Sequence, residues 1–245
     1  CDGFESGDFS AWSSNQTDNG DLSVSAAAKL VGSFGMQAVI DDNRSIFVTD
    51  DSPNGERRYR VGFYFDPNSI SMSHKDNLYI FRGLAGAGTP VLQVPFRSYN
   101  GAYQIRVALR NDSSQWISSS WFPISDEVHF IELDWQAATG AGANNGGLTV
   151  WIDGDEKASV QTVDNDTRVI DSVRLGAVAG IDSGTQGTSY FDAFESRRET
   201  AIGTAIIAQP NTDETVDSED LNIWTEEEDE PDQLAPWLFL PFVQP

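Results

Sequence analysis

The chain has 245 residues, of which 15 are basic and 38 acidic, and its formal net charge at pH 7 is −23. Such a charge repels nucleic acid and acidic membrane surfaces, and suits a solvated exterior, a basic partner or divalent cations. Cys1 is the single cysteine, so no disulfide can form within the chain, and no apolar run reaches the length of a membrane span.

The sequence begins at Cys1 without an initiator methionine or a signal peptide, which is typical of a processed mature form. A cysteine at this position carries the lipid of bacterial lipoproteins. We therefore expect either a lipid anchor at Cys1 or a residue left by another cleavage.

Strand signals recur along the first 200 residues, mostly as alternation of apolar and polar side chains. They cover residues 37–40, 45–49, 58–65, 78–82, 91–97, 103–110, 129–135, 148–152, 172–177 and 189–195. Turn dipeptides separate them, and Asp153-Gly154 after the strand at 148–152 predicts a hairpin because both residues tolerate positive φ. No segment has helical periodicity. Short strands with regular turns predict an all-β sandwich or barrel.

The ends of this region share a tripeptide, with Phe4-Glu5-Ser6 near the start and Phe194-Glu195-Ser196 near the end. This fits first and last strands that lie side by side. In the strand at 129–135 we expect Ile131, Leu133 and Trp135 to face inward.

The composition changes after residue 200. No lysine or arginine follows Ala201, and 11 acidic residues lie between Asn211 and Asp232. We predict a β-sandwich domain at 1–200, an acidic linker at 201–232 and an apolar C-terminal docking segment at 233–245.

Several motifs together resemble the concanavalin A-like jelly roll, as found in laminin-G-like domains, MAM domains and carbohydrate-binding modules. The motifs lie at residues 1–12 (CDGFESGDFSAW), 129–135 (HFIELDW), 148–154 (LTVWIDG), 170–176 (IDSVRLG) and 190–194 (YFDAF). The resemblance spans residues 2 to 198 and implies a two-sheet antiparallel jelly roll. It leaves the function open, because this fold is used by lectins, hydrolases, adhesins and structural modules.

The same resemblance implies a structural calcium ion where the first and last strands meet. It places Glu5 and Asp192 as ligands, and Asp2 and the carbonyl of Gly7 could complete the set, since calcium takes six to eight oxygen ligands. The alternative is that Glu5 and Asp192 are solvated or pair with Arg197 or Arg198.

Two saccharide functions are compatible with these motifs. Residues 132–136 (ELDWQ) resemble the catalytic strand of laminarinase-like glycoside hydrolases, but Gln136 and Ala137 stand where a second glutamate is needed. We therefore expect no enzymatic activity and keep a hydrolase as a distant alternative. Carbohydrate binding could use exposed aromatic rings at Tyr99, Tyr103, Trp116 and Trp121, although sandwich cores use the same residue types.

The C-terminal apolar residues resemble the short endings of secreted proteins of Chloroflexota-type bacteria. They are Trp237, Leu238, Phe239, Leu240, Phe242 and Val243. Added as a strand to a neighbouring subunit, this segment would build a filament or surface layer. The alternatives are that it folds back on its own domain or is a sorting signal. We expect a secreted or cell-surface protein that self-assembles through this segment, with a lectin-like adhesive module as the main alternative.

Overall fold

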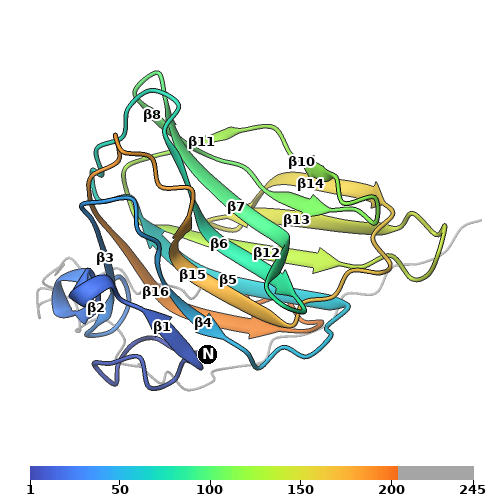
Figure 1. Cartoon of the computed structure of the whole chain (residues 1–245), viewed down its shortest axis with the longest axis horizontal. Helices are drawn as coiled ribbons and strands as arrows, with labels where there is room; N and C mark the ends of the chain where they lie inside the picture. The colour runs from blue at the N-terminus through green and yellow to red at the C-terminus, as the bar shows by residue number, and fades with distance from the viewer. Residues whose placement is uncertain (204–245) are drawn as a thin grey trace, which may run out of the picture. The chain divides into compact units, whose positions relative to one another are not determined.

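The structure is a computed structural model that describes residues 1–203 of the chain. It is an all-β jelly roll of two antiparallel sheets that pack face to face (Figure 1). The fold class predicted from the sequence is therefore confirmed. The described residues contain no helix that is long and apolar enough to cross a membrane.

The nine-stranded sheet has its main path in the order β1-β4-β15-β6-β7-β8-β11, and β9 joins it through β7 and β10 through β9. Its strands are β1 (Ser14–Gln16), β4 (Ile46–Asp50), β15 (Ser172–Ala179), β6 (Asn77–Ala85), β7 (Thr89–Tyr99), β8 (Ala102–Ile105), β9 (Ala108–Arg110), β10 (Trp116–Ser118) and β11 (Phe122–Ile124).

The seven-stranded sheet has the order β14-β13-β12-β5-β16-β3-β2. Its strands are β14 (Asp155–Val163), β13 (Gly146–Ile152), β12 (His129–Gln136), β5 (Arg58–Asp66), β16 (Gly187–Arg197), β3 (Gly35–Ile40) and β2 (Leu22–Ser25). Two short 3-10 turns, η1 (Asp18–Gly20) and η2 (Ala26–Ala28), flank β2.

The core lies between the inner faces of the two sheets and is rich in aromatic rings. Phe63 on β5 stacks on Phe81 on β6 with ring centroids 5.7 Å apart, and Phe65 meets Phe96 on β7 at 5.2 Å. Trp135 on β12 is fully buried. Alternation along each strand sends every second side chain into this core, which leaves the remaining ones on the two outer faces.

The ends of the jelly roll meet as the sequence suggested, but through a bridge. Asp2 and Phe194 exchange both backbone hydrogen bonds, at 2.8 and 2.9 Å, and Phe4 then leaves the sheet with φ of 57°. The predicted hairpin joins β13 to β14, with positive φ at both Asp153 and Gly154.

Candidate functional site

The outer face of the nine-stranded sheet carries a group of arginine and aromatic side chains. Along β7, Val94, Phe96 and Ser98 alternate with Arg97 and Tyr99, so the latter two point away from the core. The turn after β7 has positive φ at Asn100 and Gly101, and it returns β8 so that Gln104 lies opposite Arg97.

Arg97 is held at the centre of one half of this face. Its guanidinium lies 3.9 Å from the ring centroid of Trp121 and 4.6 Å from that of Tyr99. It donates two hydrogen bonds to Oε1 of Gln104, at 2.9 and 2.7 Å. The guanidinium of Arg106 also lies over the Trp121 ring, 4.6 Å from the ring centroid. Trp121 is therefore a ring that two cations fix in place.

The other half of this face is built around two further arginines. Arg174 on β15 lies 4.4 Å from the Phe47 ring, and Arg82 on β6 lies 4.1 Å from the Tyr79 ring. In the pairing of β15 with β6, Arg174 and Arg82 are direct cross-strand partners. We call Arg82, Arg97, Arg106, Arg174 and their rings Tyr79, Phe47, Tyr99 and Trp121 the arginine face.

Of the four aromatic residues predicted for sugar binding, three lie at the surface and one lies on the core side. Tyr99 and Trp121 come together around Arg97, and Trp116 on β10 is 37% exposed, 6.0 Å from Arg110. Tyr103 lies on the core side, where its ring packs against Phe96 at 5.2 Å and its hydroxyl donates to the Ile70 carbonyl. The sequence analysis did not identify the arginines, because nothing local marks which strands bring them together.

The carboxylates that resemble a glycosidase pair lie on the outer face of the other sheet. Glu132 bonds Arg60 at 3.1 Å, and Asp134 bonds Arg60 at 2.6 Å and Arg58 at 3.0 Å. Glu132 also accepts the backbone N–H groups of Ile202 and Gly203, at 2.9 and 3.0 Å. Both carboxylates are thus engaged in holding the surface of this sheet together, and Ile131, Leu133 and Trp135 face the core as expected.

A second polar group links the loop before β12 to the β13–β14 hairpin. His129 contacts Oγ of Ser125 through Nε2 at 3.0 Å and Oδ2 of Asp153 through Nδ1 at 2.7 Å. This is the order of a Ser-His-Asp triad. However, Nε2 also lies 3.3 Å from the carbonyl of Ser125, within one turn of the chain, and Asp153 also accepts the N–H of Phe130. We interpret it as a structural clamp.

Two of the four residues predicted to bind calcium converge on one loop. Glu5 accepts N–H groups from Ser33 and Phe34, and Asp192 accepts them from Leu30 and Val31. Backbone hydrogen bonds from Ser33 and then Phe34 lower the pKa of Glu5. Burial raises the pKa of Asp192, and the charge of Glu5 makes a smaller contribution in the same direction.

The alternative partners predicted for these carboxylates are engaged elsewhere. Arg197 pairs with Glu195 at 2.6 Å, and Arg198 pairs with Glu56 at 2.9 Å. Within residues 1–203, neither Glu5 nor Asp192 has a cationic side chain as an ion-pair partner. Both oxygens of Glu5 and both oxygens of Asp192 accept backbone N–H groups, so a hard cation here would bind carboxylates that are already hydrogen-bonded.

The other two predicted ligands make their hydrogen bonds to residues outside the loop at 30–34. Both carboxylate oxygens of Asp2 are occupied, one by the Phe4 N–H at 2.9 Å and the other by Nε1 of Trp12 at 2.6 Å. Gly7 donates its N–H to the Phe4 carbonyl in a turn. Asp2 therefore holds the first residues of the chain against Trp12. Glu5 and Asp192 accept hydrogen bonds from the loop at 30–34.

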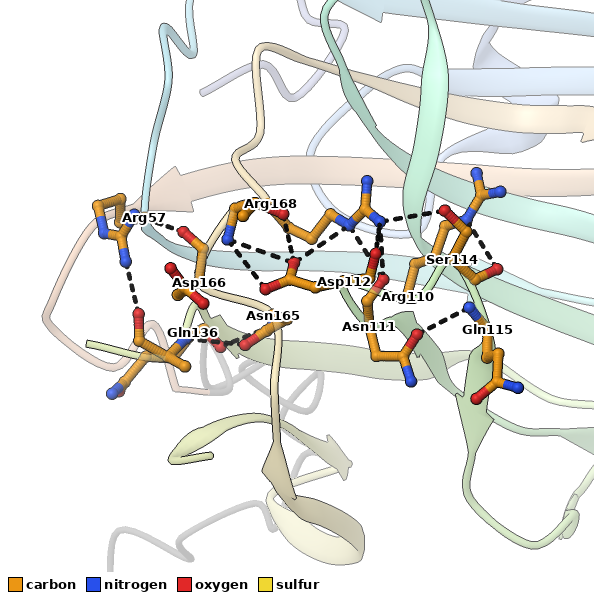
Figure 2. Close-up of polar contacts among 12 residues, drawn as sticks. Arg57, Arg110, Asn111, Asp112, Ser114, Gln115, Gln136, Asn165, Asp166 and Arg168 are labelled. Atoms are coloured by element: carbon orange, nitrogen blue, oxygen red, sulfur yellow. Dashed lines mark hydrogen bonds and ion pairs between the residues drawn. The ribbon is translucent and has the colours of Figure 1, made fainter. Parts of the chain in front are cut away.

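A third acidic group lies where the β9–β10 loop meets the β14–β15 loop (Figure 2). Asp112, Asp164 and Asp166 bring carboxylate oxygens within 4.8 Å of one another. Asp112 is bonded by the hydroxyl of Thr167 and lies 3.5 Å from Nε of Arg168, which also donates to the backbone of this loop. These contacts join the two loops, and turn chemistry accounts for them.

The six residues predicted for assembly, Trp237, Leu238, Phe239, Leu240, Phe242 and Val243, lie outside the described residues, as does most of the predicted linker. Self-assembly therefore stays a prediction.

No protein-family model matches the chain, and no curated protein matches it by sequence. Solved structures match its fold. One is a protein named cellulose-induced protein, Cip1, with 17% identity and a TM-score of 0.56, covering 83% of this chain and 98% of that one. The alginate lyase Aly36B has 12% identity and a TM-score of 0.54, covering 78% and 88%.

A third match is the globular domain of T. cruzi calreticulin, with 14% identity and a TM-score of 0.53, covering 78% of this chain and 85% of that one. At these identities the matches concern the fold alone. The chain therefore shares the two-sheet jelly-roll fold with these three proteins.

Proposed function

We propose that this protein is a non-enzymatic module that binds polysaccharide on the arginine face of its nine-stranded sheet. The observation that carries the proposal is the position of Trp121, an outward-facing ring that Arg97 and Arg106 fix at 3.9 and 4.6 Å. Flat aromatic rings held rigidly at a surface stack on the apolar face of a sugar, and arginine forks bond its oxygens. Tyr99 extends the platform on the other side of Arg97.

The comparisons support this proposal in a general way. Two of the proteins with this fold have names that refer to polysaccharides, one as cellulose-induced and one as a lyase of alginate. We propose no hydrolase role, because Gln136 and Ala137 stand where a second catalytic glutamate is needed and because Glu132 and Asp134 form ion pairs with Arg60 and Arg58. A polysaccharide ligand agrees with the secreted or cell-surface location expected from the sequence.

We also propose that Glu5 and Asp192 hold a structural Ca²⁺ ion against the loop at 30–34. The support is that two interacting carboxylates face this loop without a cationic partner within residues 1–203. The ion would supply positive charge and fix the chain start against β16, and it has no part in the binding of sugar.

The test is a glycan array probed with the full chain, followed by Trp121→Ala. Trp151→Ala is the matched control, since Trp151 is a partly buried tryptophan on the outer face of the other sheet, 5.5 Å from Arg60. Loss of a stacking ring is expected to weaken binding about tenfold or more in Trp121→Ala and to leave Trp151→Ala unchanged. Equal binding by both variants, or loss in Trp151→Ala only, would remove the arginine face as the site.

A further inference from the structure

The arginine face contains a row of polar side chains that crosses four strands. Thr49 on β4 pairs with Arg174 on β15, Arg174 pairs with Arg82 on β6, and Arg82 pairs with Gln93 on β7. Direct cross-strand partners point to the same side of a sheet, about 5 Å apart at Cβ. Two arginines are therefore neighbours at the middle of this row, with a hydroxyl at one end and an amide at the other.

These arginines lack the partners that arginine has elsewhere in the protein. On the other sheet, Arg58 and Arg60 pair with Asp134 and Glu132. Within residues 1–203, no carboxylate forms an ion pair with Arg82, Arg97, Arg106 or Arg174. In a chain with 38 acidic and 15 basic residues, acidic partners are abundant, so their exclusion from this face is informative.

Aromatic rings contact the guanidinium groups of Arg82 and Arg174, whereas Arg97 also donates Nε and Nη2 to Gln104. Arg174 lies over Phe47 and Arg82 over Tyr79, and stacking of this kind engages the face of the guanidinium and leaves its edge available. Nε of Arg82, Arg106 and Arg174 is buried and has no hydrogen-bond partner, and Nε of Arg60 on the other sheet is in the same state although Arg60 forms ion pairs through its Nη groups. A buried donor without an acceptor costs stability, and an anionic ligand would supply the missing acceptor.

The charge on this face is also costly in the free protein. Burial lowers the pKa of Arg82, and the positive charge of Arg174 lowers it further. Burial lowers the pKa of Arg97 as well, with a second contribution from Arg106. The two arginines of each pair thus repel each other, and an anion bound between them would offset this repulsion.

We infer that the arginine face selects an anionic polysaccharide, whose carboxylate or sulfate groups are bonded by the Arg82–Arg174 pair and by the Arg97–Arg106 pair. This inference rests on the proposed function. Gln93, which pairs with Arg82, and Arg97 are four residues apart on β7, which is about 13 Å along a strand. The two pairs are thus spaced for separate anionic groups of one extended chain.

The negative net charge of the whole protein disfavours anionic ligands of high charge density. Duplex DNA carries one charge per about 1.7 Å and is strongly repelled by a net charge of −23. A polyuronate carries one carboxylate per sugar, so its charge density is lower and the protein's acidic residues repel it less than duplex DNA.

The test is isothermal titration calorimetry of the full chain at physiological salt with four polymers. They are polygalacturonate, the same polymer with its carboxylates reduced to alcohols, dextran and dextran sulfate. The variants are Arg174→Gln and Arg174→Lys, with Arg44→Gln as the control. Arg44 is 66% exposed and pairs with Asp18, so its removal changes the net charge equally without touching the arginine face.

We expect the wild type to bind polygalacturonate or dextran sulfate at least tenfold more tightly than the matching neutral polymer, and the preferred polymer identifies the anionic group. Arg174→Gln should weaken that binding about tenfold or more, and Arg174→Lys should weaken it too because lysine lacks the planar fork. Arg44→Gln should change it less than twofold.

Equal binding of acidic and neutral polymers would overturn the inference and leave the proposed function standing. Binding of none of the polymers, together with an empty glycan array, would overturn both. Equal loss of binding in Arg44→Gln and Arg174→Gln would show non-specific charge attraction and overturn the selectivity.

Discussion

Arg174 and Arg82 lie directly opposite each other on neighbouring antiparallel strands, and within residues 1–203 neither pairs with a carboxylate. Like charges at such positions destabilise a sheet. The arrangement persists because Phe47 and Tyr79 hold the two guanidinium groups. Binding sites commonly carry this kind of cost, since groups arranged for a ligand are not arranged for stability.

Replacement of Arg82 by methionine should therefore stabilise the free protein. Arg82→Met keeps an apolar stem over Tyr79 and removes one of two like charges, a gain of about 0.2–1 kcal/mol. For a domain of this size that corresponds to a melting temperature higher by about 0.4–4 °C. Thermal unfolding followed by circular dichroism measures it. A lower melting temperature would mean that Arg82 stabilises the free sheet and is not held there for a ligand.

Calcium should stabilise the protein through Glu5 and Asp192. A hundredfold excess over the dissociation constant adds about 2.7 kcal/mol to the free energy of unfolding, or about 5–10 °C, relative to protein treated with a chelator. Glu5→Gln should remove this response. An unchanged melting temperature in the wild type, or an unchanged response in Glu5→Gln, would contradict a site at these residues.

Gly32 offers a sharper test of the same site. Its φ is +76°, and a Cβ built there would lie 2.3 Å from Oε1 of Glu5. Gly101 has φ of +77° with nothing within 4 Å, so Gly101→Ala carries the same backbone strain alone. Both variants should melt at lower temperature, but only Gly32→Ala should lose its response to calcium. Equal calcium responses would show that the Glu5 carboxylate is not a ligand.

Glu132 should be structural and not catalytic. Glu132→Ala removes a partner of Arg60 and leaves the Ile202 and Gly203 N–H groups without their acceptor, at about 1–3 kcal/mol for a buried group. Asp155→Ala is the control, because Asp155 is 79% exposed and its pair with Lys157 contributes little. Neither the wild type nor either variant should release reducing ends from laminarin. Release by the wild type that Glu132→Ala abolishes would restore the hydrolase alternative.

The prediction of self-assembly is tested by electron microscopy of the full chain beside a chain that ends at Gly203. Fibres or sheets from the full chain alone would support assembly through Trp237 to Val243. Monomers from both would remove this prediction and leave carbohydrate binding as the function to test.

The sequence predicted strands well where alternation accompanies burial. The predicted strand at 58–65 matches β5 (Arg58–Asp66), and that at 129–135 matches β12 (His129–Gln136). It missed β14 (Asp155–Val163), an edge strand whose side chains are mostly exposed, so that burial imposes no apolar alternation. The predicted strand at 103–110 is divided into β8 and β9, which both pair with β7.

The site was harder to predict because it depends on cross-strand register. Thr49, Arg82, Gln93 and Arg174 form one row, yet they come from strands far apart in the sequence. The prediction from aromatic residue type found Tyr99 and Trp121, but it also included Tyr103, whose ring faces the core. Trp151 is a further aromatic residue on an alternating strand, and it lies on the outer face of its sheet beside Arg60.

The most direct measurement is an NMR titration that observes the arginine Nε–H groups as a galacturonate oligosaccharide is added. Signals from Arg82, Arg106 and Arg174, whose Nε groups lack partners in the described structure, should shift with saturation, while those from Arg58 and Arg197, which are paired with carboxylates, should not. Shifts confined to Arg58 and Arg197, or no shifts at ligand concentrations that saturate binding, would contradict the arginine face as the binding site.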